Sequence, residues 1–257
     1  MVCELILAAA AVVAGSIASV AGFGIGSVLT PLLAARVGTR LAVAAVSIPH
    51  LVGTAVRFRL LRGRVDRRVF LWFGLTSAGG GLLGALVHSY ASNRALAIVF
   101  GCLLLFVGVS ELTGLMRRVR LGRGAAWIAG ALSGLFGGLV GNQGGIRSAA
   151  LLAFHLDKDV FVATATGIGL IVDGARMPVY VASEGSDLIA VWPLIGVAVG
   201  GVLFGTIVGA RLLRRVPEAR FRSFVALLLL ALGTWMVFHS LTGGECADPR
   251  PQSISSP

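Results

Sequence analysis

Hydrophobic residues fill this chain in eight long runs that are separated by short polar segments. The runs cover residues 5–35, 41–58, 69–90, 95–115, 125–154, 160–182, 188–213 and 221–242. A helix needs about 20 apolar residues to cross roughly 30 Å of hydrocarbon. Each run therefore predicts at least one membrane helix, and the first and fifth runs are too long for a single straight crossing. The pattern is typical of an all-α polytopic membrane protein.

The first run is interrupted by the stretch GFGIGSVLTP at residues 22–31. Glycine tolerates the backbone angles of a sharp turn, and proline fits the first turn of a new helix. We expect the first helix to unwind here and turn back. The fifth run carries GNQGGIRS at residues 141–148, in the matching place. Because unwound backbone in a bilayer must be satisfied by protein or water, two matched breaks indicate the binding site of a transporter.

The order of landmarks along the chain indicates an internal duplication. Three landmarks recur at an offset that grows from 118 to 120 residues: Gly26 with Gly144, Arg57 with Arg176, and Trp72 with Trp192. We predict a first membrane repeat at residues 1–122 and a second at 123–243. The remaining residues, 244–257, form a short polar tail rich in Pro and Ser, which we expect to be disordered.

Basic loops predict how the repeats are oriented. The arginine-rich loops lie at residues 57–68, 117–123 and 211–222, and short cytoplasmic loops hold the basic excess. Eight straight spans would put the third loop on the side opposite to the other two. If the first run of each repeat is broken, all three loops face the cytoplasm. We therefore predict two inverted repeats, each with a broken or re-entrant first helix plus three spanning helices, ten helical pieces in all, and both termini outside.

The loops assigned to the outside carry a weaker and partly acidic set of charges: Arg36, Arg40, His88, Arg94, Glu184 and Asp187. Composition agrees with a membrane protein, because 56% of the 257 residues are hydrophobic and only 13% are charged. The net charge of +11 comes from arginines in these short loops, which argues against nucleic-acid binding.

Enzyme signatures are missing from the sequence. The four histidines form no HExxH motif, and the chain has neither a G-x-S-x-G elbow nor a phosphate-binding G-x-x-x-x-G-K-[ST] loop. The three cysteines have no metal or disulfide spacing. We expect no enzymatic activity, no cofactor and no bound metal.

The second break holds the groups best suited to bind an anion. Asn142 and Gln143 offer amide donors, and the backbone N–H groups that follow Gly144 carry the positive end of a helix dipole. Arg147 adds a permanent charge whose planar fork matches a carboxylate, sulfite or sulfonate. An unpaired guanidinium at membrane depth is costly, so it needs a partner or a ligand. The alternative is that Arg147 pairs with a protein group such as Asp173.

Several further side chains are candidates with two interpretations each. Asp173 and Arg176 are three residues apart, which favours an intrahelical ion pair, although Asp173 is also the best-placed proton carrier. His50, beside Pro49, either titrates or binds substrate, or else is a satisfied core histidine. The small hydroxyl residues Ser27, Thr30 and Ser148 either line the cavity or hydrogen-bond within their own helix or across a helix contact. Gly24 and Gly26 of the first break are further candidates for the binding site. Arg57 lies at a predicted helix end, where snorkelling explains it.

The glycine-rich break and the apolar, proline-containing run after it, residues 24–33, resemble the sulfite exporter TauE/SafE family, the four-TMS sulfite uptake/export permeases. The resemblance covers residues 5–242 and implies a permease of the cytoplasmic (inner) membrane that moves sulfur-containing anions. The second copy departs from the family pattern, since Ala149 replaces the expected proline and Asn142, Gln143 and Arg147 interrupt an apolar glycine run.

We therefore predict a secondary transporter that exports a small anion, a sulfur oxyanion or organosulfonate, with a proton or sodium ion as the coupling ion. The alternatives are a permease for a neutral or cationic solute and a non-transporting membrane scaffold. Glycine-lined helix faces allow a homodimer in the lipid bilayer.

Overall fold

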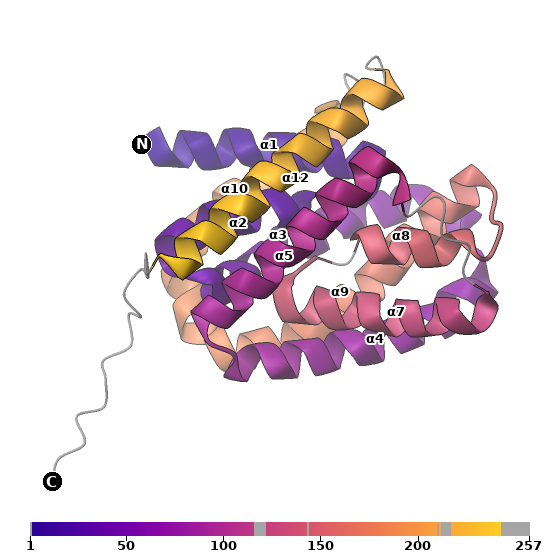
Figure 1. Cartoon of the computed structure of the whole chain (residues 1–257), viewed down its shortest axis with the longest axis horizontal. Helices are drawn as coiled ribbons and strands as arrows, with labels where there is room; N and C mark the ends of the chain where they lie inside the picture. The colour runs from indigo at the N-terminus through magenta and orange to yellow at the C-terminus, as the bar shows by residue number, and fades with distance from the viewer. Residues whose placement is uncertain (1, 116–121, 143, 210, 212–216, 243–257) are drawn as a thin grey trace, which may run out of the picture.

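The computed structural model describes residues 2–115, 122–142, 144–209, 211 and 217–242, and this part of the chain is helical without strands (Figure 1). Its ten α-helices are α1 (Val2–Ala21), α2 (Ile25–Val37), α3 (Thr39–Leu61), α4 (Arg67–Tyr90), α5 (Asn93–Thr113), α7 (Arg123–Val140), α8 (Gly144–Leu152), α9 (Lys158–Ala190), α10 (Trp192–Phe204) and α12 (Glu218–Leu241). A 3₁₀ turn, η1 (Arg62–Arg64), follows α3, and a π-helical turn, η2 (Gly205–Gly209), follows α10. The predicted all-α fold with ten helical pieces is confirmed. The predicted disordered tail, 244–257, lies outside the described residues.

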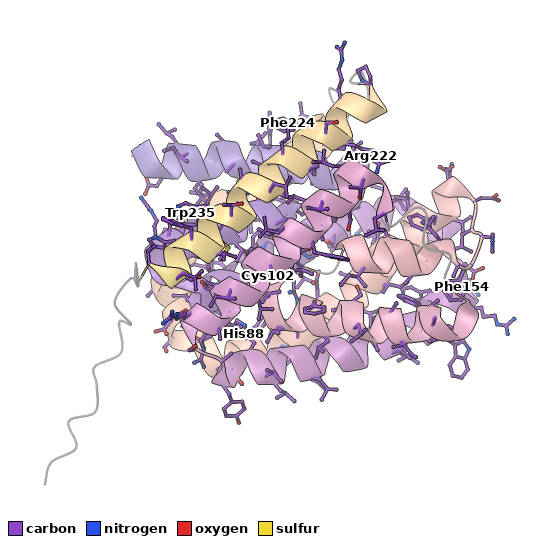
Figure 2. The ribbon with its side chains drawn as sticks, in the orientation of Figure 1. His88, Cys102, Phe154, Arg222, Phe224 and Trp235 are labelled. Carbon is purple, nitrogen blue, oxygen red and sulfur yellow. The ribbon has the colours of Figure 1, made fainter. Side chains whose placement is uncertain are left out.

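The helices suit a membrane in both length and surface. Among the described residues, six helices are long and apolar enough to cross a bilayer, and three shorter helices are also apolar. Large apolar side chains such as Leu75, Phe224 and Leu227 are exposed on the outside of the molecule. Figure 2 shows Phe224 on α12. A surface of this kind contacts lipid or another protein, and together with the six long apolar helices it indicates a multi-pass membrane protein.

Corresponding helices of the two repeats run in opposite directions. In the α5/α12 pair, Gly101 lies against Val237 whereas Gly108, two turns later, lies against Leu230. In the α3/α9 pair, Ser47 contacts Met177 and His50 contacts Asp173. Both pairs are therefore antiparallel. This is the geometry of two inverted repeats, here called the first half (residues 2–113) and the second half (123–241).

Each half also packs a helix against the other half. The helix α4 packs along α7, and α1 packs along α10 and η2. Glycines allow the close approach: Gly84 lies against the carbonyl oxygen of Leu135, and Gly205 lies against that of Val12. Gly80 and Gly201 also lie at these close contacts, whereas a side chain at Gly196 or Gly200 would meet nothing within 4 Å.

One boundary prediction was wrong in the second half. The hydrophobic run ended at residue 182, and Glu184 and Asp187 were assigned to an outside loop, but α9 continues to Ala190. The Glu184 side chain is only 5% exposed and forms an ion pair with Arg40 at 2.5 Å. Because its charge is compensated by α3, the carboxylate remains inside the helical segment.

Pro31 in the first break occupies a different position in its helix from the one predicted. Pro31 was expected to open the second helical piece, but α2 begins at Ile25 and holds Pro31 in its interior. Proline there removes the N–H that would bond the carbonyl of Ser27. The turn itself is made by glycine, since Gly24 has a φ of 130°.

Candidate functional site

The two helix breaks touch each other near the centre of the molecule. A Cβ atom on Gly26 would come within 2.5 Å of the carbonyl oxygen of Gly141, and a Cβ on Gly144 would overlap Phe23. Gly141 adopts a φ of 76°, so glycine is needed there for its backbone as well as for space. The breaks can therefore meet only because both are built from glycine.

The second break reverses the chain. Phe154, just beyond α8, packs against Trp127 in the first turns of α7, with ring centroids 5.3 Å apart. The short helix α8 thus returns along α7 instead of continuing away from it (Figure 1). This agrees with the predicted re-entrant piece, and it points the first N–H groups of α8 into the interior.

An arginine holds the end of the helix before each break. In the first half, Arg57 donates to the carbonyl of Ala18 in the last turn of α1, and its Nη2 donates to Thr54 Oγ1 at 3.2 Å. The interpretation of Arg57 as a snorkelling residue was wrong, because the residue is 9% exposed and serves as an internal cap. Cations at helix C-termini satisfy unpaired carbonyls and complement the dipole.

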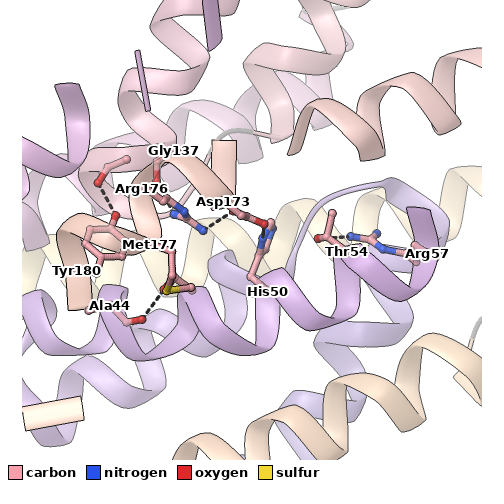
Figure 3. Close-up of polar contacts among 11 residues, drawn as sticks. Ala44, His50, Thr54, Arg57, Gly137, Asp173, Arg176, Met177 and Tyr180 are labelled. Atoms are coloured by element: carbon pink, nitrogen blue, oxygen red, sulfur yellow. Dashed lines mark hydrogen bonds and ion pairs between the residues drawn. The ribbon is translucent and has the colours of Figure 1, made fainter. Parts of the chain in front are cut away.

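The second half repeats this cap at an offset of 119 residues. Arg176 Nη1 donates to the carbonyl of Gly137 in α7 at 2.5 Å, and its Nη2 lies 2.8 Å from Asp173 Oδ1 (Figure 3). Asp173 thus stands where the first half has Thr54. The predicted Asp173–Arg176 ion pair is present, and both side chains are almost completely buried.

Asp173 has a second partner from the other half. His50 Nδ1 lies 2.7 Å from Asp173 Oδ2, which links α3 to α9 (Figure 3). Both carboxylate oxygens are therefore engaged, one by His50 and one by Arg176. No ion pair joins Asp173 to Arg147 in the described part of the chain.

A small cavity lies where the two breaks meet. Residues from both halves line it: Phe23, Gly24, Gly26, Ser27 and His50 from the first, and Gly141, Asn142, Gly144 and Arg147 from the second. Most residues that the sequence proposed for the site are thereby brought together. Thr30 and Ser148 do not line this cavity, and Gln143 lies outside the described residues.

Arg147 is the permanently charged group of this cavity, and none of the described carboxylates lies within ion-pair distance of its guanidinium. Arg147 is 4% exposed, it makes no ion pair with any of them, and its Nε and Nη1 donate no hydrogen bond. The amide Nδ2 of Asn142, 5% exposed, also has no hydrogen-bond partner among the described residues. Buried donors without acceptors cost about 1–3 kcal/mol each, and more when charged. Together with the start of α8, these groups form a set of donors that an anion would satisfy.

The structure also identifies residues that the sequence interpretation missed. Gly169 on α9 makes room for Arg147, since a Cβ there would lie 2.8 Å from Arg147 Nη1. Phe23 and Gly141 line the cavity as well. The internal duplication could have indicated Gly169 from the sequence, because Gly169 corresponds to His50 at the 119-residue offset.

Comparison with known proteins gives one result that covers most of the chain. The family model described as Sulfite exporter TauE/SafE matches residues 7–236. No curated protein and no solved structure matches the chain.

Proposed function

Because the chain belongs to the sulfite exporter TauE/SafE family, a family of membrane transporters of sulfite-type anions, we propose that it is a secondary transporter that exports a small sulfur oxyanion or organosulfonate. The observation that carries the proposal is the buried Arg147 guanidinium in the cavity between the breaks, whose Nε and Nη1 have no hydrogen-bond partner among the described residues. In a fixed site of buried donors, the oxygens of an SO₃ group would take the place of the missing acceptors.

The fold supplies a mechanism for movement. In inverted-repeat transporters the two halves rock around a binding site at their interface, which opens it to each side in turn. Here the cavity lies between the halves, and each break is fixed by its own arginine cap. In the inner membrane, the inside-negative potential favours exit of an anion by about 2.3 kcal/mol per charge per 100 mV.

The test is flux through liposomes that contain the purified protein. Liposomes are loaded with sulfite, thiosulfate, sulfoacetate, sulfate or a short carboxylate, and efflux is followed under an imposed potential. Arg147→Gln is compared with Arg59→Gln, the same substitution at an exposed arginine of α3. We expect efflux of a sulfur anion that falls by about tenfold to a hundredfold in the Arg147 variant alone, the effect of one to two charge-assisted hydrogen bonds.

The panel also separates the alternatives. Flux of a neutral solute that no anion inhibits would overturn the anion proposal. Equal anion flux in the wild type and Arg147→Gln would place the binding site elsewhere. An absence of all flux in folded protein would favour a scaffold.

The proposed orientation, with both termini outside, has its own test. Cys102 is exposed on α5 and is first replaced by serine. A membrane-impermeant thiol reagent added to intact cells should then label Cys3 and Cys246. Labelling that requires permeabilised cells would reverse the orientation, and with it the side from which the anion leaves.

A further inference from the structure

Besides its hydrogen-bond donors, the cavity contains one side chain that can also accept a hydrogen bond, the imidazole of His50. Its Nδ1 faces the carboxylate of Asp173 at 2.7 Å, and the carboxylate is completely buried. An ionised carboxylate only accepts hydrogen bonds, so Nδ1 carries the proton. In the neutral ring, Nε2 is then an acceptor with a free lone pair.

Since Nδ1 faces Asp173, Nε2 is the ring nitrogen that is left to face the cavity. The His50 side chain is 11% exposed and lines the cavity, whereas Asp173 is 0% exposed. No hydrogen bond to Nε2 is found within the described ranges. An anion held by Arg147 would therefore meet an acceptor at His50, which repels it, unless Nε2 takes up a proton and becomes a donor.

The surrounding charges determine when that proton binds. Asp173 and Arg176 face His50 from α9, Arg147 faces it across the cavity from α8, and Arg57 lies two turns along α3. The helix α10 carries no charged residue, and the one charge of α2, Arg36, lies in its last turn. In the empty site burial and the neighbouring arginines oppose a positive charge on His50, whereas the adjacent carboxylate of Asp173 favours it. A bound anion adds a second negative charge on the favouring side.

We propose that His50 is the proton-coupling site of the transporter, so that each anion is bound and carried together with one proton on His50 Nε2. Asp173 is a positioning residue, because it fixes the tautomer of the ring and its orientation. Binding of the anion and binding of the proton favour each other, and by linkage each raises the affinity of the site for the other by the same factor. This inference rests on the proposed anion transport and names its coupling ion.

Proton coupling changes what drives the export. Carrying one proton with the anion lowers the exported negative charge by one, and so it reduces the contribution of the membrane potential to export. The proton also makes the flux depend on the pH gradient. Acid on the side of the loaded anion should accelerate transport.

The experiment uses the reconstituted protein with a fluorescent pH indicator inside the liposomes, and it counts protons and anions that leave together. The variant is His50→Asn, whose amide nitrogen still donates to Asp173 but cannot take up a proton. The control is His88→Asn. His88 is the buried histidine of α4, its Nδ1 donates to the carbonyl of Leu139 at 2.8 Å, and it does not line the cavity.

For whichever sulfur anion is carried, we expect the wild type and His88→Asn to move one more proton per anion than His50→Asn. Equal proton counts in all three proteins overturn the coupling role of His50 and leave anion transport intact. Absence of anion flux in the wild type would instead overturn the proposed function.

A second measurement does not depend on the folding of any variant. With thiosulfate or sulfoacetate, which stay ionised near neutral pH, the affinity of the wild type should rise by about tenfold per pH unit as the pH falls towards the pKa of His50 in the empty site, the slope for linkage to one proton. An affinity that is independent of pH from about pH 6 to about pH 8 would contradict the proposal.

Discussion

The two halves share a scaffold but differ in the chemistry placed on it. In both, an arginine of the long central helix caps the helix before the break: Arg57 at Ala18 and Arg176 at Gly137. The position one turn before each arginine differs, because it is the neutral Thr54 in the first half and the charged Asp173 in the second.

The breaks differ in the same way. Counting from Gly26 and Gly144, the position of Arg147 in the second half is taken by Leu29, a core residue, in the first. His50 on α3 corresponds to Gly169 on α9, and the missing side chain of Gly169 is the space next to Arg147. Inverted symmetry can thus provide the movement, while asymmetry concentrates the charges into one site instead of two equal ones.

The largest expected effect is the difference in stability lost when each of the two arginine caps is replaced by glutamine. Arg176→Gln removes the charged partner of a fully buried carboxylate, and breaking a buried pair in this way costs about 3–5 kcal/mol. Arg57→Gln removes hydrogen bonds to a carbonyl and a hydroxyl, which costs about 1–3 kcal/mol. Thermal unfolding of both variants in detergent should show the clearly larger loss for Arg176→Gln.

Neutralising the carboxylate provides the control for that comparison. The double variant Asp173→Asn with Arg176→Gln removes both charges, so it should be less destabilised than the sum of its single variants. Equal losses for the Arg57 and Arg176 variants would mean that the charge of Asp173 does not distinguish the two halves.

A smaller effect is expected from filling the space next to Arg147. Gly169→Ala adds a Cβ 2.8 Å from Arg147 Nη1, so the guanidinium must shift. Overpacking of this kind costs about 1–3 kcal/mol, which corresponds to a rise in KM for the anion of about fivefold to 150-fold if the whole cost falls on binding. Gly174→Ala on the same helix meets nothing within 4 Å and is the matched control.

Anion flux measured over a concentration series separates these variants. If Gly169→Ala and Gly174→Ala have the same KM, the position of the Arg147 guanidinium does not govern binding, and the cavity is not the site.

Much of the fold followed from the sequence because its signals are local. Runs of apolar residues predicted the helices, glycines predicted both breaks, and the basic loops predicted the inverted arrangement, since each depends only on residues close together in the chain. The Asp173–Arg176 pair was also predictable from its spacing along one helix.

The structural roles that the sequence did not predict depend on contacts between segments that are far apart in the chain. Arg57 looked like a residue at a helix end because its acceptor, Ala18, belongs to another helix. Glu184 looked like a loop residue because its partner, Arg40, lies in the other half. The same holds for His50, whose link to Asp173 becomes visible only when α3 and α9 are packed together.

The smallest expected effect concerns a hydroxyl of the first half. Thr30 on α2 is completely buried, its Oγ1 has no hydrogen-bond partner among the described residues, and it does not line the cavity. Thr30→Val keeps the shape and removes the unsatisfied hydroxyl, so it should leave flux unchanged and stabilise the protein by up to about 1 kcal/mol. Thr54→Val is the matched control, since it removes the acceptor of Arg57 and should destabilise. A loss of anion flux in Thr30→Val would show that the hydroxyl of Thr30 contacts the ligand, and the assignment of the anion-binding donors to the second half would no longer describe the site.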